Sequence, residues 1–188
     1  MPVDWNAFEA AWCDSGCHSL ADLAAAHPGE RLYAAAFHLF YSDGSQILPP
    51  ALAANTEAAV HQNNGYSTRF VPPEWRWDVL DAAVDPMRLW YQRLSEEFLT
   101  VSTDAARYAA GEALEAAHDR AMTRVCKAMT ATARRGGIHD SLPANFVVVM
   151  LEGQRGEEEA GLIRASVDPR VLATVPELVE HLGDFKGA

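Results

Sequence analysis

Residues 31–57 have the sequence RLYAAAFHLFYSDGSQILPPALAANTE, which predicts a β-hairpin followed by the start of a helix. Both alternating faces of Leu32–Tyr41 are apolar, as expected for a strand that is covered on two sides, although an Ala-rich helix is an alternative. Asp43-Gly44 is a hairpin turn signal, because both residues tolerate a positive φ. Gln46–Ala53 is the expected return strand, and its two prolines predict an edge position or a bulge.

The chain before this hairpin predicts two helices. The first has three aromatic side chains spaced as on one face of an amphipathic helix, namely Trp5, Phe8 and Trp12. We expect this helix to end at residues 14–16, which read Asp-Ser-Gly. A second helix should begin at Ser19 and stop before Pro28, because a proline disfavours the α conformation in the residue that precedes it.

The chain after the hairpin is expected to enter a short helix. Asn55 or Thr56 would cap its amino terminus, with Glu57 in the positively polarised first turn. The Asn-Asn-Gly sequence at residues 63–65 would end it. Residues 68–71 then predict a short strand, which is followed by a turn.

The second half of the chain predicts further helices and one buried strand. Asp104 should open a long helix that Gly136-Gly137 terminates. Residues 145–152, NFVVVMLE, form an apolar β-branched run that predicts a central strand. The segment 154–159 is expected to be a polar surface loop. Helix starts are expected where proline follows an aspartate or interrupts an apolar pattern, at Asp85-Pro86, Asp168-Pro169 and Pro176.

These elements predict an α+β (mixed α/β) fold in a single domain, residues 1–188. We expect a small sheet of three or four strands, built from 32–41, 46–53 and 146–152 with 68–71 as the fourth, and packed by helices from both ends of the chain. Helix content should exceed strand content, since the chain is rich in alanine, the residue that enters a helix at the lowest cost.

Charge and composition limit the partners that the chain is expected to have. Fifteen basic and 26 acidic residues give 15 − 26 = −11, which disfavours nucleic acid and anionic membrane surfaces and suits a basic protein partner. The sequence has no secretory signal and no apolar run of membrane-spanning length, so we expect a cytoplasmic protein. Its three cysteines are expected to be reduced.

Three short segments, FHLFYSDG, AANTE and RFVPPEW, together resemble the bacterial family catalogued as domain of unknown function 4303. Asn55, Thr56 and Glu57 match that family's Asn-Thr-Glu motif. Its aromatic-x-Pro-x-Glu-Trp segment is approached by four residues, Phe70, Pro72, Glu74 and Trp75. The segments VVVMLEG and RASVDP resemble the family's closing strand and the segment after it, with Asp168 where Asn is usual. The resemblance runs from about Trp5 to Leu182, implies an uncharacterised soluble α/β domain, and supplies no catalytic residues.

The preferred binding site consists of Asn55, Glu57, Glu74 and Trp75, because two short motifs place polar groups beside aromatics at element boundaries. The structural alternative is that Asn55 caps a helix, Trp75 plugs the edge of the core and Glu74 pairs locally. His38, in the middle of the first strand, and His118, within an apolar helical stripe, each fit a core histidine with one satisfied hydrogen bond, and a base tuned by burial is the alternative.

The function predicted from these observations is a non-catalytic protein-interaction module, with an immunity-like role as one specific version. No catalytic residue, metal ligand or cofactor is expected, because cysteines 13, 17 and 126 lack the paired spacing of a zinc site and no serine has a nucleophile motif. One alternative is a small enzyme that uses dispersed residues such as His38, Glu74 or His139. The other is a structural subunit that self-associates.

Overall fold

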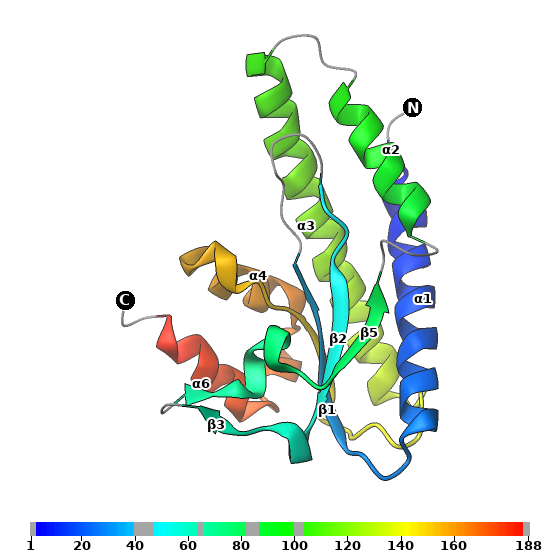
Figure 1. Ribbon diagram of the computed structural model, residues 1–188, viewed down its shortest axis with the longest axis vertical. Coiled ribbons are helices and arrows are strands. Elements are labelled where there is room, and N and C mark those ends of the chain that lie inside the picture. Colours follow the sequence, from blue (N-terminus) through cyan, green and yellow to red (C-terminus); the bar gives the residue numbers. More distant parts are fainter. Residues whose placement is uncertain (1–2, 40–46, 64–65, 82–86, 100–103, 186–188) are drawn as a thin grey trace.

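The computed structural model describes residues 3–39, 47–63, 66–81, 87–99 and 104–185. It has a four-stranded mixed sheet between two layers of helices (Figure 1), and more of the described residues are helical than extended. The predicted α+β class is therefore confirmed. Among the described helices, none combines the length and the apolar composition that crossing a lipid bilayer requires.

The main sheet has the strand order β5-β2-β1-β6. Its strands are β1 (Leu32–His38), β2 (Ala51–Thr56), β5 (Trp77–Asp81) and β6 (Val147–Met150). β1 pairs antiparallel with β2 and parallel with β6, and β2 pairs antiparallel with β5. A separate two-stranded ribbon is formed by β3 (Gln62–Asn63) and β4 (Tyr66–Ser67). The parallel pair β1–β6 joins segments from opposite halves of the chain.

Three long helices pack on one face of this sheet, namely α1 (Trp5–Ala26), α2 (Arg88–Leu99) and α3 (Asp104–Arg134). The opposite face is covered by α4 (Glu157–Ser166), by α6 (Pro176–Asp184) and by residues 70–75, with the short helix α5 (Pro169–Leu172) beside them. Alternate residues of β1 enter the two cores: Ala35 and Phe37 face the long helices, and Ala34 and Ala36 face α4 and α6. All of β1 is buried, as its two apolar faces predicted.

One continuous helix replaces the two that we predicted before β1. α1 passes through residues 14–16 without a break, so the predicted stop there and the predicted restart at Ser19 are both wrong. Gly16 is buried, and a Cβ atom at this position would lie 2.6 Å from the Cε atom of Met129 on α3. This glycine therefore allows two helices to approach closely instead of ending one. The predicted stop before Pro28 is confirmed, with Asp4 as the N-cap and His27 as the C-cap.

The return strand begins later than predicted and continues further. β2 starts after both prolines and includes Asn55 and Thr56. Thr56 is at the N-cap position of a 3₁₀ turn that begins with Glu57, so a helical start lies where it was predicted, but no side chain caps it. β2 is also an inner strand, although its register with β5 shifts between Leu52 and Ala53. The predicted turn at Asp43-Gly44 lies outside the described residues. The segment after β2 forms a 3₁₀ turn, η1 (Glu57–Ala59), in place of the expected helix.

The residues between β4 and β5 contain two further 3₁₀ turns. The strand predicted over 68–71 is wrong, because its residues form η2 (Thr68–Phe70), followed by η3 (Pro72–Glu74). The sequence did not predict β5, whose first residue, Trp77, was expected in a turn.

The remaining predictions concern helix starts and one strand, and the predicted start at Asp85-Pro86 lies outside the described residues. α3, ended by Gly136 with φ of 73°, and the starts of α5 at Asp168-Pro169 and of α6 at Pro176 are confirmed. β6 is a buried strand as predicted, but in the described sheet it pairs only with β1, so its predicted central position is wrong. It is buried because α3 and α4 cover its two faces. The loop predicted over 154–159 is largely ordered as the turn η4 (Gly153–Arg155) and the start of α4.

Candidate functional site

A cleft of about 350 Å³ lies on the α4–α6 side of the sheet, beyond the carboxyl ends of the parallel strands β1 and β6. Side chains from both strand ends, from residues 70–73, from α4 and from α6 line it. The lining residues are His38, Leu39, Phe70, Val71, Pro72, Pro73, Leu151, Glu152, Gly153, Gln154, Glu159 and His181. Most of these are apolar or backbone surfaces, with two histidines and two carboxyl groups among them.

His38 is the last residue of β1 and faces the same side of the sheet as Ala34 and Ala36. It is only 5% exposed, and neither ring nitrogen has a hydrogen-bond partner among the described residues. Burial lowers the pKa of His38, and the charge of Asp78 opposes this shift. The imidazole is therefore neutral at pH 7. Its two unpaired nitrogens are an unusual cost in a buried position.

Leu39 follows His38 with a φ of 59° and is 44% exposed. This left-handed conformation is uncommon for a residue other than glycine, asparagine or aspartate. It turns the chain out of the sheet directly after His38, so that the strand ends at the cleft. Backbone strain of this kind concentrates at functional positions.

Glu159 supplies the carboxyl group of the cleft that has the clearest pKa shift. It lies in the first turns of α4 and is 6% exposed. Burial raises the pKa of Glu159 to about 7; a backbone hydrogen bond from Glu152 opposes this shift and the charge of Glu152 adds to it. The Glu152 side chain accepts a hydrogen bond of 3.3 Å from the N–H of Gln154.

His181 reaches the cleft from α6. Its ring is tilted against the ring of Phe70 at a centroid distance of 5.4 Å, and its Nε2 atom has no hydrogen-bond partner among the described residues. Burial lowers the pKa of His181, and Asp184 opposes this shift. Both histidines of the cleft are therefore held in their neutral form.

The rim at residues 153–155 is fastened to the long helix α3. Arg155 donates to Glu115 and to Asp119, with nitrogen–oxygen distances of 2.7 Å for each. The guanidinium side chain is 14% exposed, so these contacts are partly shielded from solvent. The rim of the cleft is thus held in place by charge-assisted hydrogen bonds.

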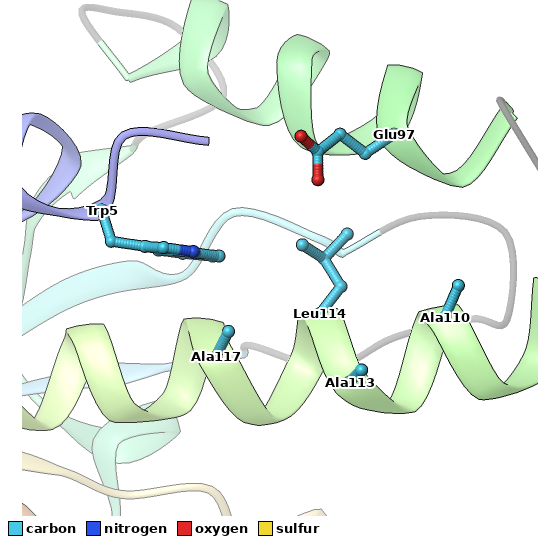
Figure 2. Close-up of a pocket in the computed structure, with 6 residues that line it drawn as sticks. All are labelled: Trp5, Glu97, Ala110, Ala113, Leu114 and Ala117. Carbon is cyan, nitrogen blue, oxygen red and sulfur yellow. The ribbon is translucent and has the colours of Figure 1, made fainter. Parts of the chain in front are cut away.

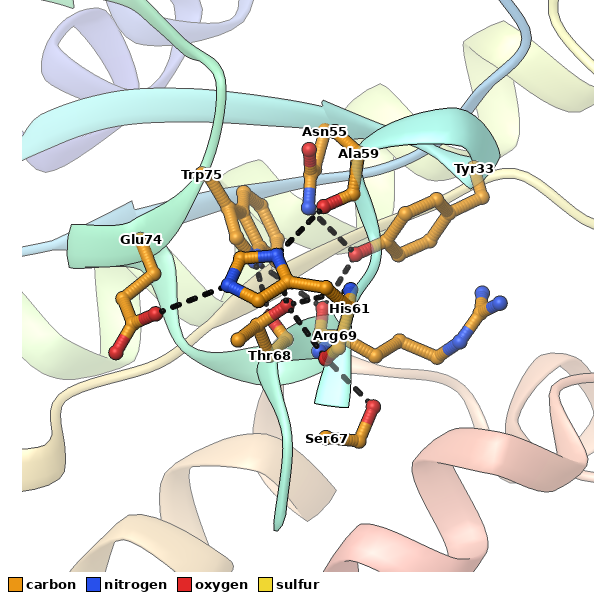
Figure 3. Close-up of polar contacts among 9 residues, drawn as sticks. All are labelled: Tyr33, Asn55, Ala59, His61, Ser67, Thr68, Arg69, Glu74 and Trp75. Carbon is orange, nitrogen blue, oxygen red and sulfur yellow. Dashed lines mark hydrogen bonds and ion pairs between the residues drawn. The ribbon is translucent and has the colours of Figure 1, made fainter. Parts of the chain in front are cut away.

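The four residues of the predicted binding site belong to one polar network, and Figure 3 shows three of them, Asn55, Glu74 and Trp75, with their partners. Asn55 donates to the Tyr33 hydroxyl at 3.1 Å, and that hydroxyl in turn donates to the backbone oxygen of Arg69. The Trp75 indole donates to the same oxygen at 3.1 Å. These groups tie β1 and β2 to the turn η2.

The two carboxylates of the predicted site are paired at the edge of this network. Glu57 forms an ion pair with Arg69, whose guanidinium lies 4.5 Å above the Tyr33 ring. Glu74 lies 3.6 Å from the Nε2 atom of His61. Asn55 and Trp75 are buried, so the four residues connect to one another instead of lining the cleft. They brace its wall, because Phe70 and Pro72 belong to the segment that they hold.

No family model, curated protein or solved structure matches this chain. The resemblance to the domain of unknown function 4303 family therefore stays a prediction.

Other residues that the sequence singled out lie away from the cleft. His118 is buried against α2, where its Nε2 atom and the Tyr91 hydroxyl are 2.8 Å apart, as expected for a core histidine. His139 contacts Ser141 at 2.8 Å in the loop before β6, at the opposite end of the sheet. Burial raises the pKa of Cys13 and of Cys17 to about 11, so both remain thiols.

A second cavity of about 300 Å³ lies between the start of α1, α2 and α3 (Figure 2). It is lined mainly by small apolar side chains, with Glu97 projecting from α2: Trp5, Glu97, Ala110, Ala113, Leu114 and Ala117. Within the described part of the chain, no three His, Cys, Asp or Glu side chains are grouped as metal ligands. The cleft at β1 and β6 therefore has the richer chemistry.

Sequence reasoning named His38 but missed Glu159 and His181. A signal existed in part, since polar residues follow the buried strand β6, and ligands favour the carboxyl ends of parallel strands. The signal required knowledge that β1 and β6 are parallel neighbours, and these strands lie more than a hundred residues apart in the chain.

Proposed function

We propose that this chain is a non-catalytic binding module whose ligand site is the cleft at the carboxyl ends of β1 and β6. The observation that carries this proposal is that neither nitrogen of the buried His38 ring has a hydrogen-bond partner in the described part of the chain. A buried polar group without a partner costs about 1–3 kcal/mol. A ligand that hydrogen-bonds to the imidazole would recover this cost, and empty protein would retain it.

The position and the lining of the cleft support the same proposal. Open sheets with parallel strands bind ligands at the carboxyl ends of those strands. Small-molecule sites combine an apolar wall with a few polar groups that fix orientation. Leu151, Phe70 and Pro72 supply such a wall here, and His38 and Glu159 supply such groups.

A binding role is favoured over catalysis by the kinds of side chain in the cleft. The neutral imidazole of His38 and the carboxyl of Glu159 could act as base and acid. However, the described residues that line the cleft include no Ser, Thr, Cys, Lys or Tyr as a nucleophile beside them. A small enzyme remains the alternative, but one built on His38 and Glu159, because Glu74 and His139 do not line this cleft.

The test is a nuclear magnetic resonance titration with three probes of one shape: benzyl alcohol, benzylamine and benzoate. We expect at least one of them to shift the imidazole resonances of His38 in a saturable manner. The resonances of His118 are the control, because this histidine is buried in the other core. If no probe shifts the imidazole resonances of His38 more than those of His118, the cleft is not a ligand site.

A protein partner is the second candidate, and the net charge of −11 favours a basic one. In its immunity-like version, the module neutralises a basic toxin. A pull-down that enriches a basic protein, with neutralisation of its activity, would support this candidate. A self-associating subunit is a third reading, which light scattering that shows only monomer would exclude.

A further inference from the structure

We propose that the ligand of the cleft is a small organic cation, a protonated amine attached to an apolar body. This inference rests on the proposed function, because it names the ligand class of the same site. Three features carry it: the charges that line the cleft, the unpartnered nitrogens of His38, and the apolar wall.

The described residues that line the cleft carry acidic but not basic side chains. Glu152 and Glu159 are among them, and they include no Lys or Arg. Of the two carboxyl groups, that of Glu159 is the proposed partner of the ligand, because the Glu152 side chain already accepts a hydrogen bond from the N–H of Gln154. An anionic ligand would meet two carboxyl groups in a site of low polarity, whereas a cation would be stabilised there.

The pKa of Glu159 is consistent with a buried carboxyl group that has no cation beside it among the described residues that line the cleft. A buried carboxyl without an opposite charge has a raised pKa, and that of Glu159 is about 7 because of burial. An ammonium group beside it would favour the carboxylate and bring this pKa down. Binding would then convert a neutral or half-ionised acid into one partner of an ion pair.

The remaining donors of an ammonium group also find acceptors. An ammonium has three N–H donors, and a neutral imidazole offers one unprotonated nitrogen as an acceptor. His38 presents this nitrogen without a competing partner among the described residues. Phe70 adds an aromatic ring, which attracts cations to its face.

The apolar wall indicates an organic cation. Phe70, Leu151 and the prolines of η3 offer contacts to a hydrocarbon body, which a hydrated inorganic ion would not use. In addition, no three His, Cys, Asp or Glu side chains of the described residues are grouped so that they could hold a metal ion. A volume of about 350 Å³ is at the small end of ligand sites, so one ring or a short aliphatic chain should fill it.

The pH dependence of binding follows from the groups that face Glu159. These are Glu152 after β6, His38 on β1 with Asp78 behind it, and His181 on α6 with Asp184 behind it. Burial lowers the pKa of both histidines below the usual 6.5, whereas Glu159 has a pKa of about 7. An amine should therefore bind more tightly as the pH rises through about 7.

The experiment measures the affinity of benzylamine, benzyl alcohol and benzoate by calorimetry at pH 6 and pH 8. Wild-type protein should bind benzylamine most tightly. Its affinity should rise by about tenfold over this range, as the ionised fraction of an acid with a pKa near 7 does. Benzyl alcohol should bind equally at both pH values, and benzoate should bind most weakly.

The variant Glu159→Gln should remove the pH dependence and lower the affinity for benzylamine at pH 8 by about tenfold, a factor that corresponds to one close charge pair. The matched control is Glu158→Gln, which removes the same charge from an exposed neighbour that does not line the cleft. If Glu159→Gln fails to fold, the wild-type pH profile still decides.

Two results would overturn the assignment of a cationic ligand without contradicting the binding site. One is that benzyl alcohol or benzoate binds as tightly as benzylamine. The other is that the affinity for benzylamine is unchanged between pH 6 and pH 8. A capped Ala-Lys-Ala peptide that binds more tightly than benzylamine would overturn the small-molecule ligand in favour of a protein lysine. Absence of binding by all three probes would instead overturn the proposed function itself.

Discussion

The two faces of the sheet each bury a histidine, and the two histidines differ in what surrounds them. His118, on the side of the long helices, is 1% exposed and lies 2.8 Å from the Tyr91 hydroxyl. His38, on the α4–α6 side, is 5% exposed and has no partner for either nitrogen among the described residues. Burial alone therefore does not distinguish a structural histidine from a ligand-binding one. The satisfaction of its hydrogen bonds does.

The two cores also differ in where their cavities lie. The core under the long helices is filled by aromatic side chains in edge-on contact, such as Trp12 and Phe37 with ring centroids 5.1 Å apart, and the cavity on this side is lined by residues of the helices alone among the described ones. The core under α4 and α6 opens into the cleft. We interpret the first face as the part that stabilises the fold and the second as the part that binds.

The largest expected effect tests whether the face under the long helices stabilises the fold. Trp12→Ala should lower the free energy of unfolding by about 3–5 kcal/mol, because Trp12 is fully buried and its removal leaves a cavity. Chemical denaturation measures this. Leu89→Ala is the control, since Leu89 is 60% exposed and should change stability by less than about 0.5 kcal/mol. A loss below about 1 kcal/mol for Trp12→Ala would contradict the comparison of the two faces.

The next effect concerns the cost of burying the Glu159 carboxyl on the α4–α6 side of the sheet. The pKa of this carboxyl rises from the ordinary value of 4.5 to about 7 on folding. Between these values the folded protein holds a proton that the unfolded chain has lost, so stability falls as the pH rises through this window. Each unit of pKa difference corresponds to about 1.4 kcal/mol, so the loss should reach about 3–4 kcal/mol.

Glu159→Gln should remove that loss, so that the variant exceeds wild type in stability at pH 8 but not at pH 4. Denaturation curves at a series of pH values measure the difference, with Glu158→Gln as the control. If wild type and Glu159→Gln respond to pH in parallel, Glu159 ionises normally in the folded protein.

The two histidines themselves give the sharpest test. His118→Leu removes the contact between the imidazole and the buried Tyr91 hydroxyl and should cost about 1–3 kcal/mol of stability. His38→Leu removes nitrogens that have no partner, so it should leave stability unchanged or increase it, and should abolish the binding of benzylamine. Denaturation and calorimetry measure the two properties separately. An equal loss of stability in both variants would mean that the two histidines serve the same purpose.

The smallest effect is expected for the exposed ion pair at the edge of the polar network that contains Asn55 and Trp75. Glu57→Gln removes the charge that pairs with Arg69, but the Glu57 side chain is 42% exposed and the pair is screened by water. The expected cost is below about 1 kcal/mol, and it should decrease as salt is added. Thermal denaturation at low and high ionic strength measures this. A cost that does not depend on salt would assign Glu57 a role beyond the ion pair.

The fold was predicted correctly where the signal was local, and incorrectly where contacts with a distant segment of the chain decide the local structure. The apolar pattern of β1 and the glycines after α3 needed no knowledge of the rest of the chain. Gly16, in contrast, looks like a helix stop in the sequence, and only the approach of Met129 explains why the helix continues. Asn55 likewise has the residue type of a helix cap, but pairing between β1 and β2 places it inside a strand.

The candidate site was predictable only in part for the same reason. The sequence drew attention to His38 and to the segment around Trp75, and the structure places both on the same face of the sheet. The polar residues after β6 were a partial signal, but they did not single out Glu159 or His181, since a glutamate in a polar run and a histidine near a helix end are ordinary surface residues. Their importance depends on which strand ends they lie against.

By itself, the sequence determined the class of the fold, the full burial of β1, and the boundaries that proline, glycine and aspartate set at α1, α3, α5 and α6. These follow from the dihedral angles and hydrogen bonds of a few neighbouring residues. Only the tertiary structure decided that β6 lies parallel to β1, and thereby brought His38, Glu159 and His181 around one cleft. Such pairings depend on contacts between segments that are far apart in the chain, and local patterns carry no information about them.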